Sequence, residues 1–211
     1  ESGVSEVLLQ EDGAAIHYSI NSNWGGGDTG AMGEGFGDYW AGSYSYSTPN
    51  GAIYHPEWIF SWDGHGTGNP CWSGRLLNKL NLVYVHTTNY GAHQSIPGGQ
   101  SDELWSTPLF QSLITLVGTH GESRESVDQI VLESHFGIGF GPKMRDLAYA
   151  TIAAAQALQP GQPHAVVFTQ KFAHHNIVED VTAVPGEGDA LPAASLRLAQ
   201  NSPNPFNPKT T

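Results

Sequence analysis

The chain is poor in cysteine, in basic residues and in long apolar runs, and each shortage excludes a class of protein. Cys71 is the single cysteine among 211 residues, so no internal disulfide can form. Lysine and arginine number 8 against 20 acidic residues, and the net charge of −12 argues against nucleic acid or an anionic membrane as a partner. No apolar run reaches the roughly 18 residues of a membrane-spanning helix. No signal peptide is recognisable.

The stretch from Val7 to Trp40 predicts two helices joined by a glycine-rich turn. The first is expected over residues 2 to about 22, and the second from about residue 29 to about 46, with Asp28 or Thr29 as its cap. Gly13 lies inside the first helix, where glycine costs about 1 kcal/mol relative to alanine. We therefore expect a second backbone to approach the first helix closely at Gly13.

The motifs of these two helices are Gln-Glu-Asp-Gly-Ala at 10–14 and Gly-Glu-Gly-Phe-Gly-Asp at 33–38. They resemble the active-site helix pair of the gluzincin metallopeptidases, the thermolysin and fungalysin group, in which a His-Glu-x-x-His helix precedes a Gly-Glu-Gly-x-x-Asp helix. The resemblance is closest to secreted bacterial fungalysin-like peptidases and covers roughly residues 5–178. It implies a mainly α fold, the helical lobe of a zincin-like peptidase with long aromatic-rich loops and without the N-terminal β lobe.

Carried over residue by residue, the resemblance implies metal-ligand positions at Gln10, Ala14 and Glu34, a general base at Glu11 and a supporting aspartate at Asp38. Both histidine ligands of the family are replaced. Alanine offers no donor atom, and a glutamine oxygen is a poor zinc ligand beside imidazole. Because catalytic zinc usually takes three protein ligands, one glutamate cannot hold it. We predict weak zinc binding or none, and no other cofactor.

Three histidines are candidates for completing such a site. His17 lies on the same helix face as Gln10 but about 10 Å further along the axis, which disfavours a shifted metal site. The resemblance also implies an oxyanion-stabilising histidine shortly before the segment Glu103-Leu104-Trp105-Ser106. His93 is the nearest match, with a longer gap than in the family, and His86 is the alternative.

The acidic residues that remain are Glu11, Glu34 and Asp38. We expect Glu11 and Glu34 to face each other across the helix pair, where repulsion leaves one of them protonated at neutral pH. Glycoside hydrolases use a protonated and an ionised carboxyl group in one site. The same pair of groups is also expected in a metal site that has lost its metal ligands. The favoured hypothesis is a metal-independent hydrolase of glycosidase type. The alternatives are an inactive pseudopeptidase or binding domain, and a metallopeptidase with an altered metal site.

Beyond residue 46 the sequence predicts extended segments at 53–62 and 80–86 within aromatic-rich loops. Helical periodicity then predicts helices over 102–120, 123–136, 142–158 and 163–177, with Ser123 as a possible cap. We group all these elements into one catalytic-type domain over residues 1–178.

The composition changes after Val178. Residues 179–195 are a Pro/Gly/acidic linker, and residues 196–211 contain Gln-Asn-Ser-Pro-Asn-Pro-Phe-Asn-Pro at 200–208. This motif resembles the start of the C-terminal sorting domains on many secreted Bacteroidetes-type proteins, which implies a secreted or cell-surface location. The expected partner is a small glycoside or peptide substrate. A helical lobe that exposes apolar surface also predicts a possible homo-oligomer.

Overall fold

The computed structural model describes residues 2–60 and 74–179, with side chains from residue 7 onward. The described part is mainly helical, as predicted, with six helices and two short pairs of strands. Residues 1–181 belong to one compact unit. Cys71, the predicted linker after Glu179 and the predicted sorting segment lie outside the described residues.

The first two helices, α1 (Ser2–Ile20) and α2 (Thr29–Tyr46), pack directly on each other. A Cβ atom added at Gly13 of α1 would lie 2.8 Å from the Cα of Gly37 in α2. One added at Gly37 would lie 2.8 Å from the carbonyl oxygen of Gln10. The close approach predicted at Gly13 is therefore confirmed, and the absence of side chains at this crossing brings Gln10 against α2.

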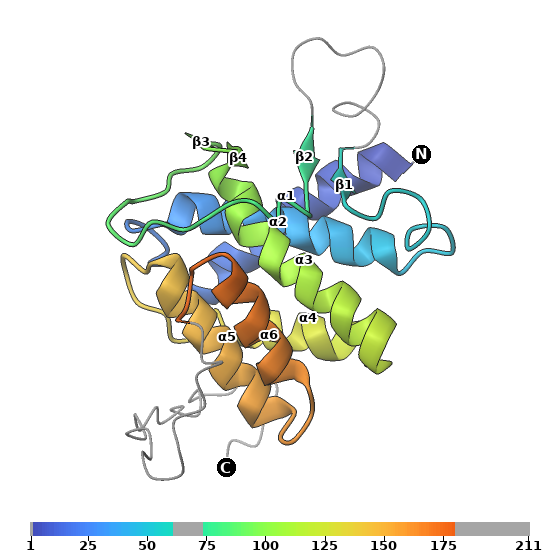
Figure 1. Ribbon diagram of the computed structural model, residues 1–211. Coiled ribbons are helices and arrows are strands. Elements are labelled where there is room, and N and C mark those ends of the chain that lie inside the picture. The colour runs from blue at the N-terminus through green and yellow to red at the C-terminus, as the bar shows by residue number, and fades with distance from the viewer. Residues whose placement is uncertain (1, 61–73, 180–211) are drawn as a thin grey trace, which may run out of the picture. The chain divides into compact units, whose positions relative to one another are not determined.

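Helix α3 (Ser101–His120) crosses the middle of the molecule, as Figure 1 shows in green. It packs against α2 on one side and against α6 (His164–His174) on the other, while α5 (Met144–Leu158) packs on α6 and α4 (Arg124–Glu133). Large side chains at these contacts have almost no exposed surface: Phe36, Leu104, Trp105, Phe110, Phe168 and Phe172. No helix in the described residues is long and apolar enough to cross a membrane.

Two short antiparallel pairs of strands lie beside the helices. Strand β1 (Trp58–Ile59) pairs with β2 (Arg75–Leu76), and β3 (Ser95–Ile96) pairs with β4 (Gly99–Gln100). The predicted extended segment at 53–62 thus reduces to a two-residue strand within its described part. The segment at 80–86 forms no β-strand. The reason is that its backbone bonds to the turn after α6, for example Tyr84 N–H to the carbonyl of His175, and not to another strand.

The predicted helices occur, with some shorter at their C-terminal ends. Helix α4 ends at Glu133 and α6 at His174, a few residues before the predicted ends at 136 and 177. Ser123 caps α4 as predicted, because its Oγ accepts a hydrogen bond from the backbone N–H of Ser126 at 3.1 Å.

Asp28 occupies the predicted N-cap position of α2, but its side chain does not cap that helix. Its carboxylate instead accepts hydrogen bonds from the hydroxyl of Tyr84 at 2.6 Å, and from the backbone N–H groups of Tyr90 and Met144 at 3.0 Å each. This buried carboxylate thereby ties the 84–90 loop and the start of α5 to α2. The loop that carries His93 is positioned in part by these bonds.

Candidate functional site

The candidate site is centred on the carboxylate of Glu34, which α2 presents toward α1. Oε2 of Glu34 accepts a hydrogen bond of 2.9 Å from Nε2 of Gln10, whose residue is 7% exposed. The same oxygen lies 3.5 Å from Nε2 of His93. The side chain of Glu34 is 29% exposed, so this carboxylate is reached by solvent on one side.

His93 is held at the site by Asp102 in the first turn of α3. The carboxylate of Asp102, which is fully buried, accepts from the backbone N–H of His93 at 2.9 Å and lies 2.6 Å from its Nδ1. His93 has a φ of 54°, a left-handed conformation that residues other than glycine seldom adopt. The bond to Asp102 requires the ring proton on Nδ1, so Nε2 is the ring atom that faces Glu34.

A buried ion pair, formed by Asp38 and Arg75, lies beside His93. Asp38, which is fully buried one turn after Glu34, pairs with Arg75 through Nε at 2.7 Å and Nη2 at 2.8 Å. Burial raises the pKa of Asp38 to about 6, although the Arg75 guanidinium acts in the opposite direction. Nη1 of Arg75 lies 3.5 Å from Nδ1 of His93, so the ion pair lies next to the imidazole. The pairing of β1 with β2 places Arg75 at this point.

Of the predicted site residues, the structure brings Glu34, Asp38 and His93 together. Glu11, on the neighbouring position of α1, is exposed, and its carboxylate takes part in no hydrogen bond or ion pair within the described residues. The predicted face-to-face contact of Glu11 with Glu34 is therefore not among the contacts of the site. His86, the alternative to His93, is exposed and packs edge-on against Tyr84.

His17 is buried in a cluster of rings away from the carboxylates. Its ring centroid lies 3.7 Å from that of Trp24, 5.6 Å from that of Phe36 and 4.6 Å from that of His135. Burial, together with nearby His135, lowers the pKa of His17 to about 3. Burial also lowers the pKa of His135 to about 4. Both imidazoles are therefore neutral at physiological pH.

The residues at the three implied ligand positions do not fit a zinc ion. Ala14 has no donor atom, and the amide N–H of Gln10, which cannot bind a cation, points at Glu34. Among the side chains that the structure describes, no three of histidine, cysteine, aspartate or glutamate are arranged to hold a metal ion.

Two residues of the site, Arg75 and Asp102, carry no motif that the sequence analysis could have used. Arg75 is one of only 8 basic residues in the chain, and this scarcity is the one signal that could have drawn attention to it. Asp102 follows His93 closely and begins a predicted helix, where an acid is also expected for helix-dipole reasons. Both are identified by their contacts in the folded chain.

The site offers two kinds of chemistry from its own residues. A carboxylate oxygen and an oriented imidazole nitrogen face each other, which suits either hydrogen bonding to a polar ligand or proton transfer. No protein-family model matches the chain, and no curated protein matches it.

Proposed function

We propose that this chain is a secreted, zincin-like domain that binds peptides without zinc-dependent cleavage, that is, a pseudopeptidase. The observation that carries the proposal is the 2.9 Å hydrogen bond from Nε2 of Gln10 to Oε2 of Glu34. In the helix pair that the sequence resembles, these two positions share a metal ion. Here an amide N–H satisfies the carboxylate directly, so Glu34 does not need a cation as its partner. Secretion is proposed from the sorting-type motif at 200–208.

The groups that remain accessible suit a peptide backbone. Glu34 accepts hydrogen bonds, and Nε2 of His93 accepts one when the ring is neutral and donates one when it is protonated. The His93 side chain is 51% exposed, and its orientation is set by Asp102 before any ligand arrives. When the ring of His93 is protonated, Glu34 as acceptor and Nε2 of His93 as donor match the N–H and C=O groups of one peptide unit.

The proposal is tested first by restoring the missing imidazoles. We expect the purified chain to retain no stoichiometric zinc after dialysis and to leave casein uncut. The double variant Gln10→His with Ala14→His should retain about one zinc ion by elemental analysis, because it supplies three ligands. Adding Glu34→Ala to that double variant is the matched control and should abolish zinc retention. Chelator-sensitive casein cleavage by the unmodified chain would overturn the proposal.

Binding itself is tested with N-acetyl-glycyl-leucinamide as the probe. In a titration followed by amide NMR, we expect shifts at Glu34 and His93, while mass spectrometry finds the peptide intact. Glu34→Gln and His93→Gln should each weaken these shifts. Glu125→Gln is the control, because the side chain of Glu125 is 75% exposed and lies on α4. Unchanged spectra at high peptide concentration would contradict peptide binding at this site.

A metal-independent hydrolase is the second candidate, and one observation favours it. Oε2 of Glu34 lies 3.5 Å from the Nε2 of His93, and buried Asp102 orients that imidazole, an arrangement that suits general acid–base catalysis. In the glycosidase form of this hypothesis, Glu11 and Glu34 are the two carboxylates. A panel of aryl glycosides, assayed with chelator, tests it. Cleavage lost in both Glu11→Gln and Glu34→Gln would support the glycosidase, and loss in Glu34→Gln and His93→Gln alone would support the carboxylate–imidazole pair.

A further inference from the structure

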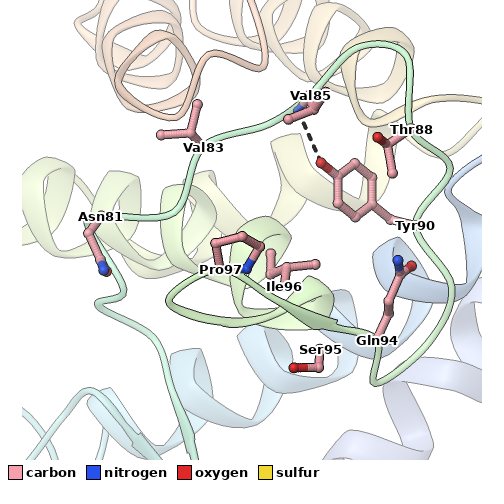
Figure 2. Close-up of a pocket in the computed structure, with 9 residues that line it drawn as sticks. All are labelled: Asn81, Val83, Val85, Thr88, Tyr90, Gln94, Ser95, Ile96 and Pro97. Carbon is pink, nitrogen blue, oxygen red and sulfur yellow. Dashed lines mark hydrogen bonds between the residues drawn. The ribbon is translucent and has the colours of Figure 1, made fainter.

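A pocket of about 410 Å³ opens between the 81–90 segment and the β3–β4 hairpin. This volume is within the range of about 300–1,000 Å³ that is typical of ligand pockets. Figure 2 shows Val83 and Val85 on one side, with Ile96 and Pro97 of the hairpin across from them. None of the lining residues is charged, although the chain has a net charge of −12. The complete lining is Asn81, Val83, Val85, Thr88, Tyr90, Gln94, Ser95, Ile96 and Pro97.

One wall of this pocket is formed by residues 82–85, whose backbone bonds alternate in direction as in an extended chain. The carbonyl of Leu82 accepts from Nδ1 of His175, and Tyr84 donates its N–H to the carbonyl of His175. The carbonyl of Tyr84 accepts from the side-chain amide of Asn176. These bonds tie residues 82 and 84 to the turn that follows α6.

In an extended chain, the N–H and C=O of one residue point to the same side, and those of the next residue point to the other. The backbone groups of Val83 therefore point away from the turn after α6, toward the hairpin side of the segment. Within the described residues, neither has a hydrogen-bond partner. The neighbouring N–H of Val85 is already satisfied by the hydroxyl of Tyr90, the bond drawn in Figure 2. Val83 thus offers one open donor and one open acceptor at the pocket.

We propose that an extended, uncharged peptide segment binds at this pocket as an added strand. One peptide residue exchanges both backbone hydrogen bonds with Val83 and places an apolar side chain among Val83, Val85 and Ile96. The geometry is consistent, because side chains of directly opposed residues in an antiparallel pair lie on the same face. Val83 is 57% exposed and Val85 is 50% exposed, so both present apolar surface that such a side chain would cover.

The uncharged lining decides between possible occupants. A charged side chain would lose its hydration here without gaining an ion-pair partner. A small apolar molecule would fill the pocket but leave the two backbone groups of Val83 without partners. Two hydrogen bonds and one buried side chain correspond to a dissociation constant on the order of millimolar for a short peptide. This inference does not rest on the chemistry at Glu34 and would hold for a binding domain or an enzyme.

The experiment is an amide NMR titration of the full chain with the peptide acetyl-Ala-Ala-Leu-Ala-Ala-amide. We expect shifts at Val83, Val85 and Ile96, and at least tenfold weaker binding when Leu is replaced by Asp. Methylation of the leucine amide nitrogen removes one of the two backbone bonds and should weaken binding severalfold. If the methylated peptide binds as well as the parent, the pocket holds only an apolar side chain and the added strand is overturned.

Two variants with equally exposed valines give the control. Val83→Asp should abolish the shifts, whereas Val166→Asp on α6 should leave them unchanged, since Val83 is 57% and Val166 59% exposed. Shifts at Val83 that appear on concentrating the protein without peptide would identify a second copy as the occupant and overturn the proposal. No shift in this region with any peptide would also overturn it. Resonances of Glu34 and His93 report the other site in the same spectra, so failure of one proposal is distinguishable from failure of the other.

Discussion

The backbones of Gly13 and Gly37 cross so closely that a Cβ atom at Gly13 would lie 2.8 Å from the Cα of Gly37. This crossing sets the distance between α1 and α2. Gln10 lies about one turn before Gly13 on α1, and Glu34 lies about one turn before Gly37 on α2. The crossing therefore also sets the length of the hydrogen bond between Gln10 and Glu34. The geometry of the candidate site depends on two residues that have no side chain.

We expect Gly13→Ala to lower the free energy of unfolding by about 1–3 kcal/mol, because the added methyl group forces two backbones apart. This cost outweighs the gain in helix propensity of about 1 kcal/mol. Chemical denaturation measures it. Gly139→Ala is the matched control, because a Cβ there meets nothing within 4 Å, and its stability should be unchanged or slightly raised. Equal stability of the two variants would show that the helices separate without cost.

The ion pair of Asp38 with Arg75 gives a prediction about protonation. Burial raises the pKa of Asp38 to about 6, and the guanidinium opposes that rise. Arg75→Met should therefore raise the pKa of Asp38 further, by about 1–3 pH units, so that the carboxyl is protonated at neutral pH. The carboxyl ¹³C chemical shift of Asp38 follows this titration. Arg124→Met is the control, since Arg124 pairs with Asp128 at 3.1 Å, and it should leave the titration of Asp38 unchanged.

The buried imidazoles predict loss of stability in acid. Folding lowers the pKa of His17 from an ordinary value near 6.5 to about 3. Between these two pH values the imidazole is protonated in the unfolded chain and neutral in the folded chain. The stabilising contribution is complete above pH 6.5 and is lost as the pH falls toward 3. The slope is about 1.4 kcal/mol per pH unit for one group.

The variant His17→Phe should remove that slope from the pH dependence of unfolding between pH 6.5 and 4. Buried His135 contributes a similar slope in both proteins, so it cancels in the comparison. Denaturation midpoints at several pH values measure the effect. His86→Phe is the matched control, because it removes an exposed imidazole outside the buried cluster. An unchanged slope in His17→Phe would mean that His17 is accessible to protons in the folded chain.

Exposed apolar side chains on α1 predict self-association. Leu8 is 61% exposed and Tyr18 is 62% exposed, and both lie on the helix that carries Gln10. Sedimentation velocity over a range of concentrations should detect a dimer or larger species, and Leu8→Asp should shift the distribution toward monomer. Val166→Asp on α6 is the control for an added charge. A clean monomer at high concentration would contradict the prediction.

The sequence alone was informative where a pattern repeats along the chain. Apolar periodicity predicted the helices, the chemistry of serine predicted the cap at Ser123, and the cost of glycine in a helix predicted the close approach at Gly13. It did not reveal the partners of the 80–86 segment. Backbone groups of that segment bond to His175 and Asn176 after α6, which no local pattern reveals.

The chain by itself determined that its fold is mainly helical, and its sequence contains acids at 11, 34 and 38 in motifs that resemble a metal-binding helix pair. Only tertiary structure decided which of those acids lie together, because Arg75 and Asp102 reach the site from distant segments. Contacts of this kind depend on how helices cross and how loops return, not on neighbours in sequence. The hydrogen bond from Gln10 to Glu34, on which the proposed function depends, is a consequence of that crossing.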